Sequence, residues 1–334
     1  MKDLQAIVAH LSAPESTGDS AVLATLVAVE GSSYRRAGAR LLVTSAGARI
    51  GSISGGCLEE DVLNHAISVF KSGQAELVVY DTTSENDLIW GVGLGCHGIA
   101  RVLIEKLQSG SSWPSALATN LREQRATEIA VVWKASDPHL LGTHLSGGLP
   151  PLQAGTAVFH ETIEPAPSLF IYGAGDDAKP LVRGAKEFGW RVIVADPRAA
   201  FASPSRFPEA DGLVVAPAHE LVAQTSPGPS ALAVIMTHHY VHDVPLLRDL
   251  LPRPLAYLGL LGPKKRAEKI LADLTAAGSA IAPEQRARIH APVGLNLGAE
   301  TPAEVALSIL AEMKTVLGGR DGRPLRERKG PIHD

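Results

Sequence analysis

The sequence predicts an α/β protein in which an N-terminal mixed α/β domain precedes a C-terminal Rossmann-like domain with a doubly wound parallel sheet. Its 334 residues are enough for two hydrophobic cores. An apolar run over 169–172 leads into a Gly-x-Gly-x-x-Ala turn that begins at Gly173, and helical spacing follows the turn. This order of strand, glycine turn and helix is typical of the first unit of a Rossmann fold.

The domain boundaries follow from composition. Residues 160–168 are polar and contain two prolines, as expected of a connection between domains. We therefore expect a first domain over 1–160, a linker over 161–168 and a Rossmann-like domain over 169–318. The last residues, 319–334, are rich in glycine, arginine and lysine and are expected to form a flexible basic tail.

The amino-acid composition and the net charge are those of an ordinary globular protein. Hydrophobic residues make up 45% of the chain and charged residues 20%, and the formal net charge is −4. Aromatic residues make up only 4%, so we expect no nucleic-acid partner. Two cysteines, Cys57 and Cys96, are too few for a disulfide framework, which favours a cytoplasmic location. We see no secretory signal at the N-terminus and no apolar run long enough to span a membrane.

The first half alternates short apolar runs with polar turns. Residues 21–29 are apolar throughout, which predicts a strand buried on both faces. Residues 31–40 form a basic loop with three arginines, Arg35, Arg36 and Arg40, which could clamp a phosphate or lie in solvent. The other expected elements are a helix over 4–11, a hairpin of strands over 41–44 and 48–53, strands over 76–80, 99–107 and 129–133, and a helix over 113–124.

The stretch 51–61 (GSISGGCLEED) concentrates the chemistry of this half. Gly55 and Gly56 let the backbone approach a ligand closely, and helical spacing begins after Cys57. Free N–H groups at a helix start attract anions and would stabilise a thiolate, the nucleophilic and metal-binding form of cysteine. Glu59 and its acidic neighbours oppose that effect. The alternative is a tight turn followed by an ordinary buried cysteine.

A second glycine-rich loop, residues 91–98, carries Cys96. Four glycines in eight positions exclude a helix and predict either a sharp bend or a close approach to a ligand. The two cysteines form no Cys-x-x-Cys pair, so structural zinc is not expected. They either converge on one soft ligand or are two unrelated buried residues.

The second half reads as a continuing Rossmann unit. Gly173 and Gly175 form the turn, and Asp196 ends the next strand, where an acidic residue can bind a ribose hydroxyl. Asp176 and Asp177 would repel a pyrophosphate at the helix start. Further strands are expected over 191–195, 212–215, 231–237 and 255–258, and a capping box at Thr301 predicts a last helix to about 317.

Two other positions are candidates for binding. His238 follows the predicted strand 231–237, where ligands of doubly wound sheets bind. Lys264 and Lys265 precede a helix, and cations at that end are explained by a bound phosphate or by a solvated cluster.

Taken together, these motifs resemble the XdhC/CoxI family, accessory proteins of xanthine dehydrogenase and related molybdenum hydroxylases. The resemblance rests on residues 31–39, 53–59 and 93–98 in the first half. In the second half it rests on residues 173–178, 237–239, 257–262, 292–295 and 298–302. Other members carry histidine where this chain has Asp176.

The resemblance implies a dimeric chaperone that binds the molybdenum cofactor, assists its sulfuration and inserts it into an apo-hydroxylase, with a cysteine desulfurase as a possible second partner. Carried onto this sequence, it makes Cys57 and Cys96 candidate ligands of the cofactor and its metal. Thiolates suit a molybdenum centre, and the arginines and lysines named above could hold the phosphate of the pterin.

Two other functions stay open. One is an NAD(P)-dependent oxidoreductase that uses the Rossmann-like domain and His238 as the acid or base. The other is an interaction scaffold that joins a sulfurase to its target, which would not require either cysteine.

Overall fold

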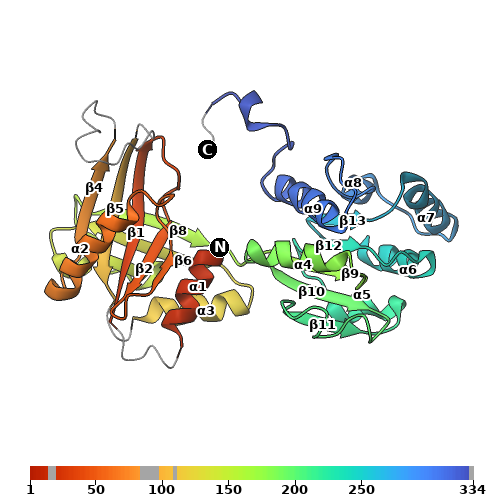
Figure 1. Cartoon of the computed structure of the whole chain (residues 1–334), viewed down its shortest axis with the longest axis horizontal. Helices are drawn as coiled ribbons and strands as arrows, with labels where there is room; N and C mark the ends of the chain where they lie inside the picture. Colours follow the sequence, from red (N-terminus) through yellow and green to blue (C-terminus); the bar gives the residue numbers. More distant parts are fainter. Residues whose placement is uncertain (14–19, 83–97, 108–110, 331–334) are drawn as a thin grey trace. The chain divides into compact units, whose positions relative to one another are not determined.

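A computed structural model of the chain describes residues 1–13, 20–82, 98–107 and 111–330 (Figure 1). The chain forms two compact units, and it passes from the first to the second between Pro165 and Ala166. The last strand of the first unit, β8 (Ala157–Ile163), extends into the segment predicted as a linker. The first strand of the second unit, β9 (Ser168–Tyr172), begins at its other end. Only residues 164–167 of that segment are free of regular structure.

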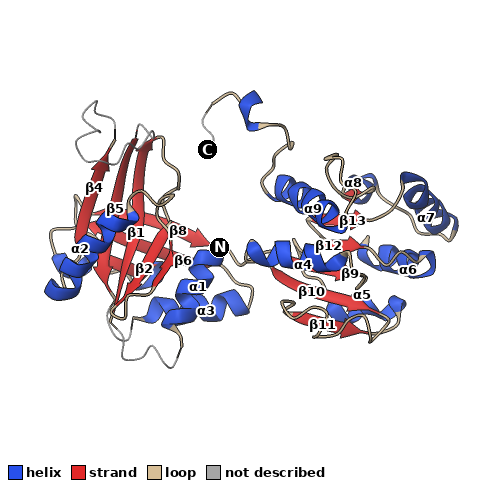
Figure 2. Ribbon diagram, in the orientation of Figure 1, coloured by secondary structure: helices blue, strands red, loops and turns tan. Residues whose placement is uncertain are grey.

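The first unit is a mixed α/β structure with two antiparallel sheets (Figure 2). One sheet has five strands in the order β3-β2-β1-β5-β4, and the other has the order β7-β6-β8. The elements, in chain order before β8, are α1 (Lys2–Leu11), β1 (Ala21–Gly31), β2 (Arg40–Thr44), β3 (Arg49–Gly51), α2 (Glu59–Ser72), β4 (Glu76–Asp81), β5 (Gly98–Lys106), α3 (Ser112–Arg122), β6 (Thr127–Lys134), η3 (Pro138–Leu140), β7 (Gly142–Leu145) and η4 (Ser146–Gly148).

Strand β1 is the centre of this unit, and the prediction that it is buried on both faces is confirmed. Its residues are buried from Ala21 through Val27. Val22, Ala24 and Leu26 pack with helix α2. Alternate residues pack into a second cluster with helices α1 and α3 and strand β6. The sequence Ala-Val-Leu-Ala-Thr-Leu-Val is apolar almost throughout because neither face of the strand meets water.

The second unit is a Rossmann-like domain, as predicted. Its six strands are parallel and lie in the order β11-β10-β9-β12-β13-β14. The elements that follow β9 are α4 (Ala178–Glu187), β10 (Arg191–Asp196), β11 (Gly212–Val215), α5 (Ala218–Thr225), β12 (Leu232–Ile235), α6 (Tyr240–Leu250), β13 (Tyr257–Leu260), α7 (Lys264–Ala276), α8 (Pro283–Ala287), β14 (Ile289–His290), α9 (Pro302–Leu317) and η5 (Leu325–Glu327).

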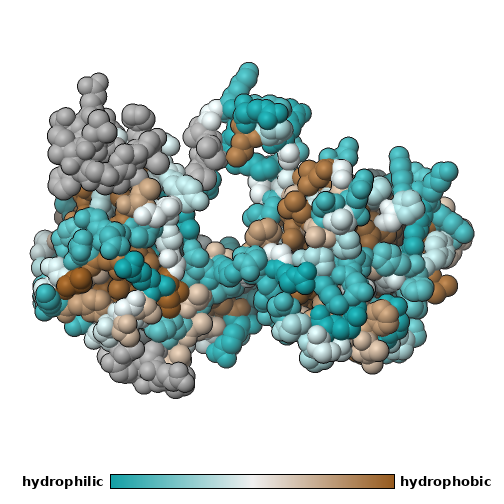
Figure 3. All heavy atoms as spheres, viewed as in Figure 1, coloured by the Kyte–Doolittle hydropathy of each residue, from teal (hydrophilic) through white to brown (hydrophobic). Residues whose placement is uncertain are grey.

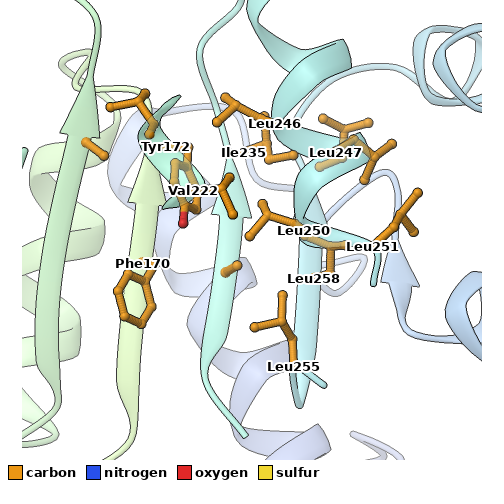
Figure 4. Packing of buried hydrophobic residues seen from close by; sticks show 14 of the residues in the cluster. Phe170, Tyr172, Val222, Ile235, Leu246, Leu247, Leu250, Leu251, Leu255 and Leu258 are labelled. Carbon is orange, nitrogen blue, oxygen red and sulfur yellow. The ribbon is translucent and has the colours of Figure 1, made fainter. Parts of the chain in front are cut away.

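Each face of this sheet is covered by its own helices. Phe170 and Tyr172 of β9 pack with side chains of α5, α6 and α7, several of which Figure 4 shows from close by. Leu169 and Ile171, the alternate residues, pack with α4 and α9 on the opposite face. A parallel sheet covered in this way places its ligand crevice where the strand order reverses, which here lies between β9 and β12.

Two local predictions are confirmed. Thr301 is the N-cap of α9, and the Glu304 side chain accepts a hydrogen bond from the Thr301 amide at 2.8 Å, which completes the capping box. Gly173 has φ of +122°, and a Cβ at this position would lie 2.4 Å from the carbonyl oxygen of Met236. Only glycine permits this approach of the turn to the chain after β12.

The face shown in Figure 3 is mostly hydrophilic, with hydrophobic residues on the first unit and over α9, where Leu307 is 60% exposed. Among the residues that the structure describes, no helix is both long and apolar enough to cross a membrane.

Candidate functional site

The Gly-Gly-Cys turn lies between β3 and α2. Gly56 adopts a positive φ of +109°, which reverses the chain just before Cys57. The Cys57 thiol is exposed, so the alternative of an ordinary buried cysteine is wrong. Helix α2 begins at Glu59, two residues after the cysteine. Cys57 therefore belongs to the turn and not to the first helical turn.

Glu59 folds back onto the chain that precedes the turn. Its Oε1 accepts hydrogen bonds from the amides of Ser54 at 2.8 Å and Ile53 at 3.2 Å, and the Ser52 hydroxyl lies 2.8 Å away. Its Oε2 accepts a short hydrogen bond from the Ser54 hydroxyl. Partial burial opposes ionisation of this carboxyl, but the hydrogen bonds from Ser54 and Ser52 outweigh it and lower the pKa of Glu59 to about 2.

Ser54 connects this carboxylate to the turn. Its hydroxyl oxygen accepts from the amides of Gly56 at 3.2 Å, Cys57 at 3.1 Å and Leu58 at 3.1 Å. These are the amides that precede the helix, and we expected them to be free for an anion or a thiolate. That expectation is wrong for these three, because Ser54 already occupies them.

Cys57 contributes to the lining of a pocket in the first unit. The lining also includes Ser32, Ser33, Tyr34 and Gly55. The Tyr34 side chain lies against Gly55, where a Cβ would be 3.5 Å from the tyrosine ring. The tyrosine is nevertheless 67% exposed. The pocket thus combines a thiol, hydroxyl groups and two tyrosine rings, and the rest of its lining is largely apolar.

The three arginines of the basic loop have different surroundings. Arg40 is 3% exposed, pairs with Glu161 at 2.7 Å and donates to the Gly38 carbonyl, so it is a structural residue of the core. Arg35 pairs with Asp3 at 3.0 Å and is partly exposed. Arg36 is exposed and has no ion-pair partner among the described residues.

The second predicted thiol, Cys96, and most of its glycine-rich loop lie outside the described residues. Within the described part of the chain, no three His, Cys, Asp or Glu side chains gather closely enough to hold a metal ion. The convergence of the two thiols stays a prediction.

At the Rossmann turn, the residue that was predicted to bind a ribose is already paired within the protein. Asp196 is 1% exposed and accepts from the Ala174 amide at 2.8 Å. The Arg198 guanidinium binds both of its oxygens at 2.8 Å. Burial opposes ionisation of Asp196, but the bonds from Arg198 and Ala174 prevail and lower its pKa. A ribose would have to compete with this guanidinium for the carboxylate.

The two acidic residues that follow Gly175 are also paired. Asp176 binds Lys179 at 2.8 Å and Arg206 at 3.1 Å. Asp177 accepts from His238 Nε2 at 2.7 Å, across the crevice between β9 and β12. His238 has a positive φ of +60° and its side chain is 59% exposed. The structure thus places His238 at the predicted ligand edge, in contact with a carboxylate.

The basic cluster at the start of α7 divides into two kinds of residue. Lys264 and Lys265 are exposed, and Lys264 lies 3.9 Å from Glu268. Arg266 forms a short ion pair with Asp243, which is 1% exposed. Within this cluster, the two lysines are the residues open to an external anion.

Three contacts of these sites were not predicted from the sequence. The first is the set of hydrogen bonds that joins Ser54 to the turn and to Glu59. The position of this serine, two residues before Gly56 and five before Glu59, was the available signal. Arg198 stands two residues after Asp196, close enough to be suspected as its partner. The pairing of Asp177 with His238 has no sequence signal, because 61 positions separate the two residues.

Comparisons with known proteins agree with this architecture. A family model described as the XdhC Rossmann domain matches residues 169–313, and one described as the XdhC and CoxI family matches residues 15–81. The chain is 36% identical over 316 residues to a protein of Bacillus subtilis (strain 168) described as a probable subunit of xanthine dehydrogenase. That match covers 88% of this chain and 92% of the relative.

A more distant relative is "Molybdenum cofactor insertion chaperone PaoD" of Escherichia coli (strain K12), 27% identical over 308 residues, 90% of this chain and 84% of the relative. A crystal structure described as a xanthine dehydrogenase from Bacillus halodurans superposes with a TM-score of 0.79 at 29% identity, over 96% of this chain and 97% of that chain. By sequence along nearly its whole length and by fold, the chain belongs to the XdhC and CoxI family.

Proposed function

We propose that this chain is an accessory protein that carries the molybdenum cofactor as cargo, assists its sulfuration and inserts it into a xanthine dehydrogenase-type hydroxylase. The observation that carries the proposal is the exposed Cys57 thiol at a pocket, on a turn whose backbone is fixed by Ser54 and Glu59. The name of the relative PaoD supports the choice of cargo.

The chemistry of the pocket fits this cargo. A cysteine thiolate is a soft ligand, and soft ligands suit a molybdenum centre that is already bound by sulfur. The Tyr34 ring rests on Gly55 and is exposed, so it offers a surface on which a flat heteroaromatic ring can stack. Ser32 and Ser33 add hydroxyl groups that can hydrogen-bond to the polar edge of a pterin.

The phosphate of the cargo needs a cation outside the turn, because the three amides of the turn already donate their hydrogen bonds to Ser54. Arg36 is the exposed guanidinium of the neighbouring loop, and Arg35 can contribute if it exchanges its contact with Asp3. Lys264 and Lys265, which are exposed cations of the second unit, stay candidates for binding a phosphate there. Cys96 is proposed as a second thiol ligand.

The proposal includes partners. The recipient is a molybdenum hydroxylase without its cofactor, and a cysteine desulfurase would supply the sulfur for sulfuration. We also propose that the chain acts as a homodimer in the cytoplasm.

The first test measures molybdenum in the purified protein. The chain is produced in cells that make the cofactor, and bound metal is determined by mass spectrometry for wild type and for the Cys57→Ala, Cys96→Ala double variant. We expect molybdenum in the wild type and little in the variant. Equal amounts in both would refute thiolate binding and favour a scaffold that needs neither cysteine.

A second test separates the accessory role from that of an oxidoreductase. Titration of the purified chain with NAD(H) and NADP(H) is expected to give no binding in the micromolar range, because the Arg198 guanidinium already binds both oxygens of Asp196. Tight binding together with reduction of a small substrate would favour the oxidoreductase.

A further inference from the structure

We propose that Glu59 is a positioning residue that acts through Ser54 to hold the Gly56–Leu58 turn, and so keeps the Cys57 thiol at the pocket. The inference rests on the proposed function, since it concerns the same cysteine. In this role Glu59 holds the Cys57 thiol in place and does not itself contact the cargo.

The three amides of the turn point in one direction. Successive backbone N–H groups that point toward one spot form a small anion-binding concavity. In this turn the spot is occupied by the hydroxyl oxygen of Ser54, 3.1–3.2 Å from the nitrogens of Gly56, Cys57 and Leu58. A neutral hydroxyl is a modest acceptor for three donors.

Glu59 is the source of negative charge for this concavity. The Ser54 hydroxyl donates its hydrogen to Oε2 of Glu59, and a hydrogen bond to a carboxylate is about twice as strong as one between neutral groups. Donation to a carboxylate polarises the hydroxyl oxygen and makes it a better acceptor. Glu59 thus supplies, through Ser54, the negative charge that the three amides attract.

Glu59 is itself held in place. Its other oxygen, Oε1, is fixed by the amides of Ile53 and Ser54, which lie on the opposite side of the turn. The carboxylate therefore joins the chain before the turn to the first residue of α2. Gly55 and Gly56, which lie between these anchors, would otherwise leave the turn loosely defined.

A consequence concerns the orientation of the cargo. Because an internal group fills the amide concavity, a phosphate has no place in it, and the turn offers the exposed sulfur of Cys57 instead. The metal end of the cargo is thus the end that meets this turn.

The test uses the full chain and two matched pairs of variants. Ser54→Val and Ser54→Thr have nearly the same shape and differ in the hydroxyl group. Glu59→Gln removes the charge, and Glu60→Gln is its control, because the neighbouring Glu60 side chain is 81% exposed and its ion pair among the described residues is a 3.5 Å contact with Arg49. Circular dichroism checks that each variant is folded.

Two quantities are measured, the hydrogen exchange of the amides of residues 56–58 and the molybdenum bound per chain after production with the cofactor. We expect Ser54→Val and Glu59→Gln to exchange at least about tenfold faster and to hold at least about fivefold less molybdenum. Ser54→Thr and Glu60→Gln should stay within about twofold of wild type in both. If residue 54 acted through its volume alone, Ser54→Thr would show the same hydrogen exchange and the same bound molybdenum as Ser54→Val.

Exchange at the wild-type rate in folded Ser54→Val and Glu59→Gln would overturn the positioning role. Faster exchange with unchanged molybdenum would overturn the connection between the turn and the cargo. A wild-type chain that holds no molybdenum would refute the proposed function, and the exchange rates would still decide whether Glu59 positions the turn.

Discussion

Replacement of Glu59 by glutamine should destabilise the first unit in a pH-dependent way. The pKa of this carboxyl falls from 4.5 to about 2 on folding. By linkage, such a difference corresponds to about 3 kcal/mol at neutral pH. The carboxyl is partly exposed, and screening by water reduces the expected loss to about 1–2 kcal/mol.

The sign of the pH dependence follows from the lowered pKa. The stabilisation by Glu59 is fully present above pH 4.5 and is lost as the pH falls toward 2. Urea unfolding at pH 7 and at pH 3, followed by circular dichroism, should therefore show a larger difference between wild type and Glu59→Gln at pH 7. The Glu60→Gln variant controls for loss of an exposed charge. Equal free energies of unfolding at pH 7 for wild type and Glu59→Gln would refute the assignment of these hydrogen bonds.

Three further changes test the Rossmann-like unit by urea unfolding. Gly173→Ala should cost about 1–3 kcal/mol more than Gly278→Ala, because both have positive φ but only Gly173 would also clash with backbone; equal losses would contradict the close approach. Thr301→Ala should cost about 1 kcal/mol through loss of the N-cap, and no change would contradict the capping box. Arg198→Ala should cost about 3 kcal/mol, because it leaves the buried Asp196 carboxylate without its cation, and a loss below about 1 kcal/mol would show that the pair is weak.

The pattern of apolar residues was sufficient to predict most of the fold. The uninterrupted run over 21–29 predicted a strand buried on both faces, and β1 has helices and a second sheet to bury it. The run could not show that its neighbours are antiparallel, nor predict the irregular register between Leu26 and Ala28, since both depend on strands distant in the chain. In the second unit, the glycine turn and the strands that follow were enough to predict a Rossmann-like order.

Prediction of the candidate site was less complete because its side chains are fixed by partners that the sequence does not reveal. Arg40 looked like a phosphate ligand, but Glu161, 121 positions away, binds it in the interior. Asp196 was placed correctly at the end of β10, yet its pairing with Arg198 was overlooked. Cys57 was identified from its glycines, whereas the support from Ser54 depends on how the chain folds back over the turn.

The central claim is that the Cys57 sulfur binds the molybdenum of the cargo. X-ray absorption at the molybdenum edge measures it most directly, because it counts the sulfur neighbours of the metal. Protein carrying the cofactor should show one more sulfur ligand in the wild type than in the Cys57→Ala variant, which keeps Cys96 to hold the metal. The same number of sulfur neighbours in both would contradict the account.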